Sequence, residues 1–148
     1  MYGSRHIIKG FSLLEVMIAV FILAIGLLGL AHLQAITLKQ NESAYLRSQV
    51  SALAADIFDR MRANQVAAIA GNYNHGQADE PPPVLNTIAA IDISEWLNNV
   101  STILPDGNGS IYCNPCSAGS VYLVTLKLTE LQSDGLRGTS QFDYSGAL

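Results

Sequence analysis

One run of apolar residues, from Phe11 to Ala31, limits what this 148-residue chain can fold into. Glu15 is the only charged residue within the run. A helix needs about 20 mainly apolar residues to cross the hydrocarbon core of a bilayer, so the run is long enough to span one. The sequence therefore predicts a membrane-spanning helix close to the N-terminus.

The residues in front of this helix predict how it is processed. A short basic stretch with Arg5 and Lys9 ends at a small residue, Gly10. An ordinary secretory signal has its small-residue cleavage site after the apolar segment, which is then lost. Cleavage at Gly10 would remove the leader, residues 1–10, and keep the helix. By the positive-inside rule, the leader stays in the cytoplasm and the part after the span is exported.

The helix is expected to continue beyond the membrane. No proline occurs between Phe11 and about Ala70, and the later apolar residues recur at spacings of three and four, which puts them on one face of a helix. These residues are Leu46, Val50, Leu53, Ile57 and Met61. Asp56 and Arg60 are expected to form an i,i+4 ion pair. We therefore predict a transmembrane or fibre-core helix over 11–32, an amphipathic continuation over 33–70, and a globular head over 71–148.

The head is predicted to combine a short helix with strands. Residues 71–83 (GNYNHGQADEPPP) have the composition of a loop. Asp92 and Glu95 resemble a capping box that starts a second helix, with Trp96 as a core anchor, and Pro105 ends it. Alternating residues indicate a strand over 121–128, with weaker candidates at 110–113 and 139–144. The expected fold class is α+β: a long N-terminal helix packed on a small antiparallel sheet.

Two segments of the sequence resemble known families. Residues 10–16 (GFSLLEV) are similar to the processing motif of type IV prepilins and type II secretion pseudopilins. Residues 43–49 (SAYLRSQ) and 56–64 (DIFDRMRAN) resemble the V-type (PilV) minor pilins, also called type IV pilus modification proteins. The resemblance implies a type IV pilin-like fold, cleavage after Gly10 by a prepilin peptidase, and N-methylation of the new terminus at Phe11.

The same resemblance implies a function. The chain would be a minor pilin, not an enzyme, that primes type IV pilus assembly in a tip complex with other minor pilins and the major pilin, beneath a possible tip adhesin. It would support adhesion and twitching motility, and would lie in the inner membrane with its C-terminus in the periplasm before assembly and on the pilus afterwards. A minor pseudopilin of a type II secretion system is the alternative, because it shares the motif.

Glu15 is the costliest residue of the apolar run. A carboxylate near the end of a membrane helix costs about 2–3 kcal/mol, so it needs a partner or a proton. The resemblance implies that it pairs with the amino terminus of Phe11 on a neighbouring subunit, whereas the simpler interpretation is that it reaches the lipid headgroups. Gly26 and Gly29 lie in mid-span, either as a point where the helix loosens or as a close-packing notch between helices; the sequence leaves both open.

Cys113 and Cys116 form a C-x-x-C motif, which can be a redox site, half of a zinc site or a short disulfide. Zinc needs two more ligands, and the only histidines are His6, His32 and His75. A loop-pinning disulfide is favoured, and a membrane-anchored periplasmic thiol oxidoreductase is the rival function. A calcium-loop spacing that starts at Asp106 fails at its twelfth position, so no metal and no cofactor are expected.

Charge argues against a nucleic-acid partner. The formal net charge is −4, from eight Lys and Arg and twelve Asp and Glu. Loss of Arg5 and Lys9 with the leader would leave six basic residues against twelve acidic ones. A nucleic-acid surface needs clustered basic residues, which this chain lacks.

Overall fold

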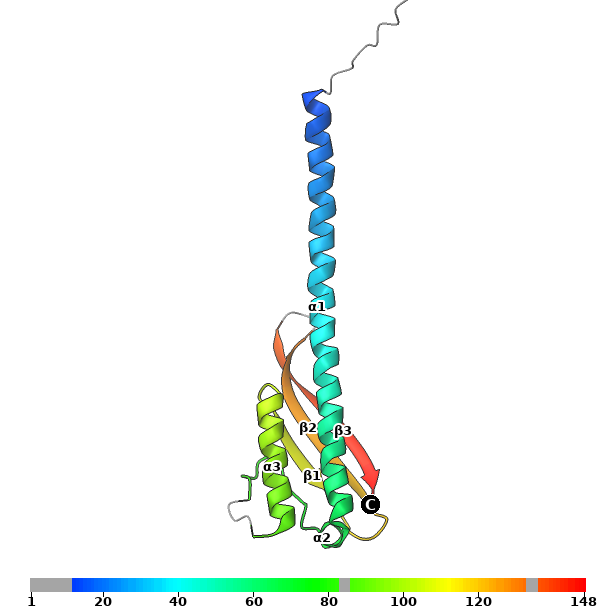
Figure 1. The fold of residues 1–148 in the computed structure, drawn as a ribbon, viewed down its shortest axis with the longest axis vertical. Coiled ribbons are helices and arrows are strands. Elements are labelled where there is room, and N and C mark those ends of the chain that lie inside the picture. The colour runs from blue at the N-terminus through cyan, green and yellow to red at the C-terminus, as the bar shows by residue number, and fades with distance from the viewer. Residues whose placement is uncertain (1–11, 83–85, 133–135) are drawn as a thin grey trace, which may run out of the picture. The chain divides into compact units, whose positions relative to one another are not determined.

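The computed structural model describes residues 12–82, 86–132 and 136–148. The chain divides into two compact units, one up to Gln40 and the other from Asn41 to Leu148. Helix α1 (Leu13–Ala63) contributes residues to both units (Figure 1). Helix α1 begins at Leu13, within the apolar run for which the sequence predicts a membrane span.

The second unit is an α+β head, which confirms the expected fold class. After α1, the elements are α2 (Gln65–Ile69), α3 (Ile88–Ile103), β1 (Asn108–Tyr112), β2 (Val121–Leu131) and β3 (Arg137–Ala147). The strands form one antiparallel sheet in the order β1-β2-β3. Ile111 pairs with Val124, and Leu126 pairs with Phe142. The second-unit part of α1 and helix α3 lie on the same face of this sheet (Figure 1).

The core of the head is the predicted stripe on α1, covered by the inward face of β2. All five stripe residues are buried, with Val50, Ile57 and Met61 fully inaccessible. The β2 residues in the same cluster are Tyr122, Val124, Leu126 and Leu128. Burial of this apolar surface, at about 25 cal/mol per Å², is the main stabilising term of so small a head.

Trp96 joins α3 to both the long helix and the sheet. Its indole Nε1 donates a hydrogen bond of 2.9 Å to the carbonyl oxygen of Leu53. Its ring lies against Gly109 of β1 so closely that a Cβ there would come within 2.4 Å of a ring carbon. Glycine is therefore required at this position, and the core-anchor interpretation of Trp96 holds.

Several element boundaries differ from the sequence prediction. The helix expected to reach Ala70 stops at Ala63, because Asn64 leaves helical geometry with φ −119° and ψ 50°, and α2 follows. Helix α3 begins at Ile88, before the predicted capping box, and its N-cap is Thr87, whose hydroxyl accepts from the Ala90 N–H at 3.1 Å. Strands β1, β2 and β3 all occur where strands were expected, but β2 and β3 are longer.

Candidate functional site

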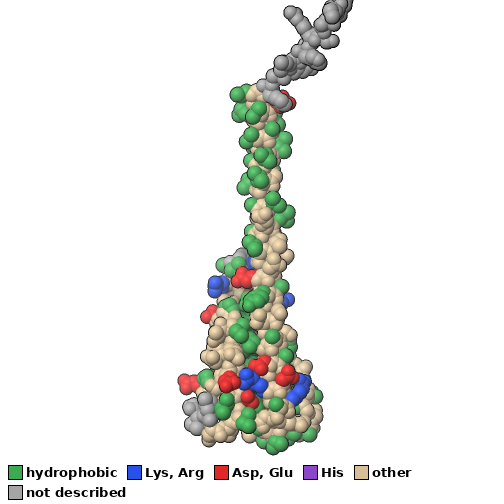
Figure 2. Space-filling model, in the orientation of Figure 1, with side chains coloured by type: hydrophobic (Ala, Val, Ile, Leu, Met, Phe, Trp, Pro, Cys, Tyr) green, Lys and Arg blue, Asp and Glu red, His purple; other side chains and the backbone are tan. Residues whose placement is uncertain are grey.

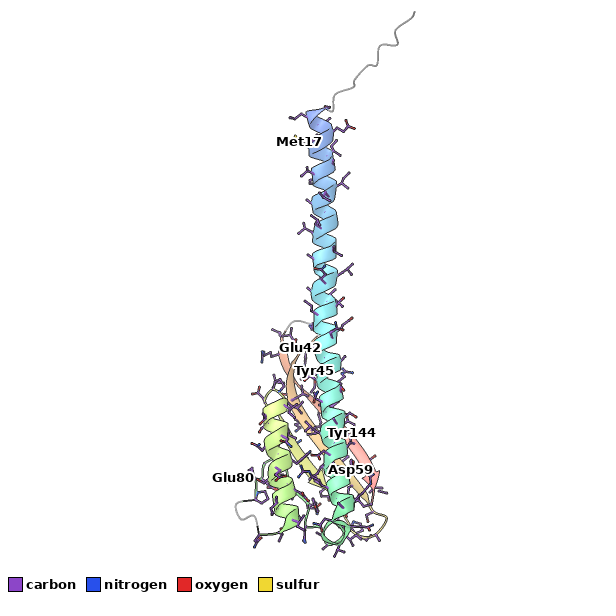
Figure 3. The ribbon with its side chains drawn as sticks, in the orientation of Figure 1. Met17, Glu42, Tyr45, Asp59, Glu80 and Tyr144 are labelled. Atoms are coloured by element: carbon purple, nitrogen blue, oxygen red, sulfur yellow. A yellow bond between two sulfur atoms is a disulfide. The ribbon has the colours of Figure 1, made fainter. Side chains whose placement is uncertain are left out.

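The first unit presents an apolar helix surface with almost no intramolecular cover. Leu13, Phe21 and Leu28 are 81%, 68% and 72% exposed, and no residue of its most apolar stretch is buried. Figure 2 shows apolar side chains along this part of α1, and Figure 3 shows side chains projecting from it, among them the labelled Met17. By length and composition, α1 is the one helix in the described part of the chain that could cross a membrane.

Glu15 lies in the first turn of α1, next to its N-terminus. Its backbone N–H donates to the carbonyl oxygen of Ser12 at 3.0 Å. The positive end of the helix dipole favours a carboxylate there by a few tenths to about 1 kcal/mol, which offsets part of the cost of a charge in lipid. Gly10 and Phe11, the predicted processing residues, lie outside the described residues. The predicted pairing of Glu15 with the Phe11 terminus therefore stays a prediction.

Gly26 and Gly29 have no packing partner within their own chain. A Cβ built at either position meets nothing within 4 Å outside the local helix backbone. The head and the rest of the described chain therefore do not require glycine at these positions. A requirement for glycine would have to come from other helices in the membrane or in an assembly.

A cluster around Arg60 fastens α1 to α3 in the head. The guanidinium Nη1 donates to Asp92 at 3.2 Å and to Glu95 at 2.9 Å, while Nε contacts Asp56 at 3.2 Å. Tyr73 donates its hydroxyl proton to the second Asp92 oxygen. Figure 2 shows acidic and basic side chains gathered over the neighbouring ends of α1 and α3. We call these five residues the Arg60 cluster.

The electrostatics of the Arg60 cluster indicate a structural role. The hydrogen bond to Glu95 is the largest cause that raises the pKa of Arg60. Burial, and then the hydrogen bond to Asp92, raises the pKa of Tyr73 to about 12. Both groups thus keep their protons at neutral pH, and every carboxylate of the cluster is already engaged. The predicted Asp56–Arg60 pair is present. The contacts of Arg60 with Asp92 and Glu95, which lie 32 and 35 residues further along the chain, were not predicted, because periodicity within one helix does not show which other helix packs against it.

Cys113 and Cys116 are joined by a disulfide, with their Cα atoms 5.2 Å apart. They lie in the connection between β1 and β2, whereas a redox-active C-x-x-C is expected between a strand and a helix. The side chain of Asn74 accepts from the Cys113 N–H at 2.9 Å and donates to the Cys113 carbonyl at 3.3 Å. The disulfide loop is therefore tied to the segment that follows α2.

Metal ligation finds no support in the described part of the chain. Within residues 12–82, 86–132 and 136–148, no group of three or more His, Cys, Asp or Glu side chains could hold a metal ion. Asp106, the first position of the failed calcium spacing, is an exposed turn residue with φ 51°.

Comparison with known proteins assigns the N-terminal segment. Residues 5–31 match the family model for the prokaryotic N-terminal methylation motif. The match covers residues 5–10 of the predicted leader, including Gly10, and the whole apolar run from Phe11 to Ala31, including Glu15. No curated protein and no solved structure matches the chain. The chain thus carries a prepilin-type N-terminal methylation motif, which is consistent with a type IV pilin-like protein.

Proposed function

We propose that the chain is a minor pilin, a subunit without enzymatic activity that primes type IV pilus assembly in a tip complex with other minor pilins. The observation that carries this proposal is the combination of a prepilin-type motif over residues 5–31 with a helix whose apolar surface is exposed. Such a surface is stable only in lipid or against other helices, and a pilus subunit needs both environments in succession.

In this proposal, the N-terminal helix and the head have separate roles. The subunit waits in the inner membrane with its head in the periplasm. After cleavage at Gly10, the amino terminus of Phe11 pairs with Glu15 of the neighbouring subunit and draws it out of the bilayer in register. The small head then selects the partners: other minor pilins, the major pilin and a tip adhesin. The assembled subunit lies on the pilus and supports adhesion and twitching motility.

A substitution at Glu15 tests the proposal. Glu15→Ala should reach the membrane in at least wild-type amounts, because it removes the cost of the carboxylate. Its recovery in sheared pili and with co-purified pilins should fall about tenfold, equivalent to a lost interaction of about 1.4 kcal/mol. Glu42→Ala is the matched control, since Glu42 is an exposed carboxylate on the same helix outside the motif. Gly10→Val supplies the unprocessed reference, which should keep residues 1–10 by intact-mass measurement.

Two results would contradict the proposal. Wild-type recruitment of Glu15→Ala would exclude the inter-subunit pairing. Co-purification of the wild-type chain with a secretion apparatus, and with no pilus, would favour the minor pseudopilin, which the shared motif keeps as the second candidate. The thiol oxidoreductase is tested separately: exchange of both cysteines for serine should leave the periplasmic disulfide-exchange activity of the cell unchanged.

A further inference from the structure

The sheet of the head has one edge that is partly covered and one edge that is open. At the β1 edge, His75 pairs with Ile111 through two backbone hydrogen bonds of 2.9 Å each. At the other edge, no strand or bridge among the described residues lies beside β3. The 11 residues of β3 include no proline and no lysine, and its register with β2 is continuous, without a bulge. Natural edge strands usually carry such features, because an edge without them accepts a further strand.

The pairing pattern of the sheet shows which backbone groups of β3 are free. The N–H and carbonyl groups of Ile111 bond to His75, away from β2. Backbone direction alternates along a strand, so Thr125 of β2 directs its groups to β1, and the next residue, Val124, bonds to Tyr144 of β3. The β3 residues that direct their N–H and carbonyl groups outward are therefore Thr139, Gln141, Asp143 and Ser145. Within the described chain, no hydrogen bond to any of these backbone groups is present.

The core side of the sheet is incompletely covered beside this edge. Phe142 and Tyr144, the latter labelled in Figure 3, are on the core side but are only partly buried. The guanidinium of Arg47 on α1 lies 5.9 Å from the ring centre of Phe142, and it forms no ion pair with a described carboxylate. A strand added outside β3 would place every second side chain on this side. The edge therefore suits a segment with alternating apolar residues and a carboxylate near Arg47.

A second copy of the chain suits this edge less well. Strand β3 runs in the same direction as α1, since Arg137 lines a small pocket with Leu46, and a Cβ at Gly146 would contact Phe58. Copies inserted in one membrane have their α1 helices in the same direction, and therefore their β3 strands too, which excludes a two-fold antiparallel pair of β3 edges. Pairing of β3 with β1 of another copy would meet the His75 segment, which already occupies that edge.

We propose that the outer edge of β3 binds an extended segment of another protein, which adds to the sheet as an antiparallel fourth strand. The free N–H and carbonyl groups of β3 supply the affinity, as in other cases of strand addition. Antiparallel pairing continues the arrangement of the sheet and is the more stable per residue. Apolar side chains of the segment rest on Phe142 and Tyr144, and its carboxylate pairs with Arg47. This surface goes beyond the proposed assembly function, and its test needs no pilus.

The test measures binding of a designed nine-residue peptide to the full-length chain in detergent. Valine alternates with threonine in this peptide, and glutamate replaces the central valine. Fluorescence anisotropy should give a Kd below about 1 mM. Amide hydrogen exchange, read by NMR, should slow at the outward-facing Gln141, Asp143 and Ser145 and stay unchanged at Phe142 and Tyr144, which already bond to β2. A peptide N-methylated at its threonines, whose N–H groups face β3 in antiparallel pairing, should not bind.

Two variants of the chain separate strand addition from other modes of binding. Gln141→Pro removes an N–H that the pairing with β2 does not use, so the fold should persist by circular dichroism while peptide affinity falls at least about tenfold. Gln141→Ala is the matched control: it loses the same side-chain hydrogen bonds to Asp143, keeps the N–H, and should bind as wild type. Arg47→Gln should weaken binding of the glutamate peptide about threefold, and that of an all-valine version not at all.

Several results would overturn the proposal. They are absence of peptide binding, equal binding of the N-methylated peptide, and equal binding by a folded Gln141→Pro. Dimerisation of the wild-type chain alone that Gln141→Pro abolishes would also overturn it, since a second copy would then occupy the edge. If Gln141→Pro does not fold, the N-methylated peptide decides the outcome with the wild-type chain.

Discussion

Apolar residues of helix α1 are exposed in the first unit and buried in the second, although both units contain part of this helix. Up to Gln40, isoleucines and leucines are exposed on all sides of the helix, and Ile25 is 56% exposed. On α1 from Asn41 onward, the large aliphatic residues are confined to one buried stripe, and Ile57 is fully buried against the sheet. The difference is not residue type but what surrounds it: charged and small residues flank the stripe in the second region, whereas apolar residues surround the helix in the first.

This contrast shows how one helix can suit two environments: lipid or a helix bundle around its first part, and a folded head against its second part. A helix that is apolar all round is stable in lipid or in a bundle, and an amphipathic one packs against a folded head. In the second region, the polar face of α1 also carries the Arg60 cluster, which fastens α3 to it. The head therefore gains both its core and its main polar contacts from the part of α1 that follows the apolar run.

The same substitution placed in each region gives the largest expected difference. Ile57→Asp buries an unpaired charge in the core and should cost about 4–5 kcal/mol, most of the stability of a small domain. Ile25→Asp should leave the melting of the head unchanged in detergent, but should oppose membrane insertion by about 2.5–3.5 kcal/mol. Circular dichroism melts and membrane fractionation measure the two effects.

Equal melting of Ile57→Asp and wild type would overturn the contrast. The stripe on α1 would then face a partner helix, and the head would fold without it. Arg47→Ala is a milder comparison within the second region. Its guanidinium lies 5.9 Å from the ring centre of Phe142, so its loss should cost no more than about 0.5–1 kcal/mol.

The disulfide gives the next largest effect and is confined to the head. In exported protein, Cys113 and Cys116 should be oxidised to each other with no metal bound, as mass shifts after alkylation before and after reduction would show. Replacing both by serine should lower stability by about 2 kcal/mol, the loop-closure value for so short a loop. Free thiols in freshly isolated native protein would be inconsistent with the disulfide in the structure.

The contrast between the regions was predictable from sequence, but the contacts that hold the head together were not. Apolar periodicity located the stripe on α1 and the strand around Val124, because burial of a helix or strand face repeats at fixed intervals. The Arg60 cluster could not be predicted, since Arg60 and Glu95 meet only through the packing of α1 on α3.

The capping box was predicted wrongly. The spacing of Asp92 and Glu95 fits one, yet Thr87 caps the helix and leaves both carboxylates to pair with Arg60. The segment around His75 was predicted only as a loop, because its single bridge to Ile111 of β1 produces no periodic pattern in the sequence.

Removing an ion pair should cost less stability than removing the disulfide, and a partly buried pair in the Arg60 cluster should cost more than an exposed pair. Arg60→Gln should destabilise the head by about 1 kcal/mol, a value reduced because its side chain is 25% exposed. Asp59→Asn is the matched control on α1, because it removes the exposed pair with Arg62 and leaves the contact of Arg62 with the Phe58 ring in place. The side chains of that pair are 54% and 75% exposed, so its loss should cost at most about 0.5 kcal/mol. Urea unfolding at low and high salt measures both, and equal losses would deny the cluster any special role in joining α1 to α3.

The smallest expected effect is a pH dependence that belongs to the head alone. Burial lowers the pKa of His75 below its usual 6.5, so the folded state binds a proton less readily than the unfolded chain. Its contribution to stability is complete above pH 6.5 and declines as the pH falls from 6.5 through the lowered pKa. Asp143, whose pKa is lowered first by the hydrogen bond from Thr125 and then by Gln141, acts only in a more acidic window, below its usual 3.8. Melting temperatures between pH 7 and pH 5 should therefore fall more for wild type than for His75→Gln, which cannot titrate there. Parallel declines in the two proteins would show that protonation of His75 is not linked to unfolding.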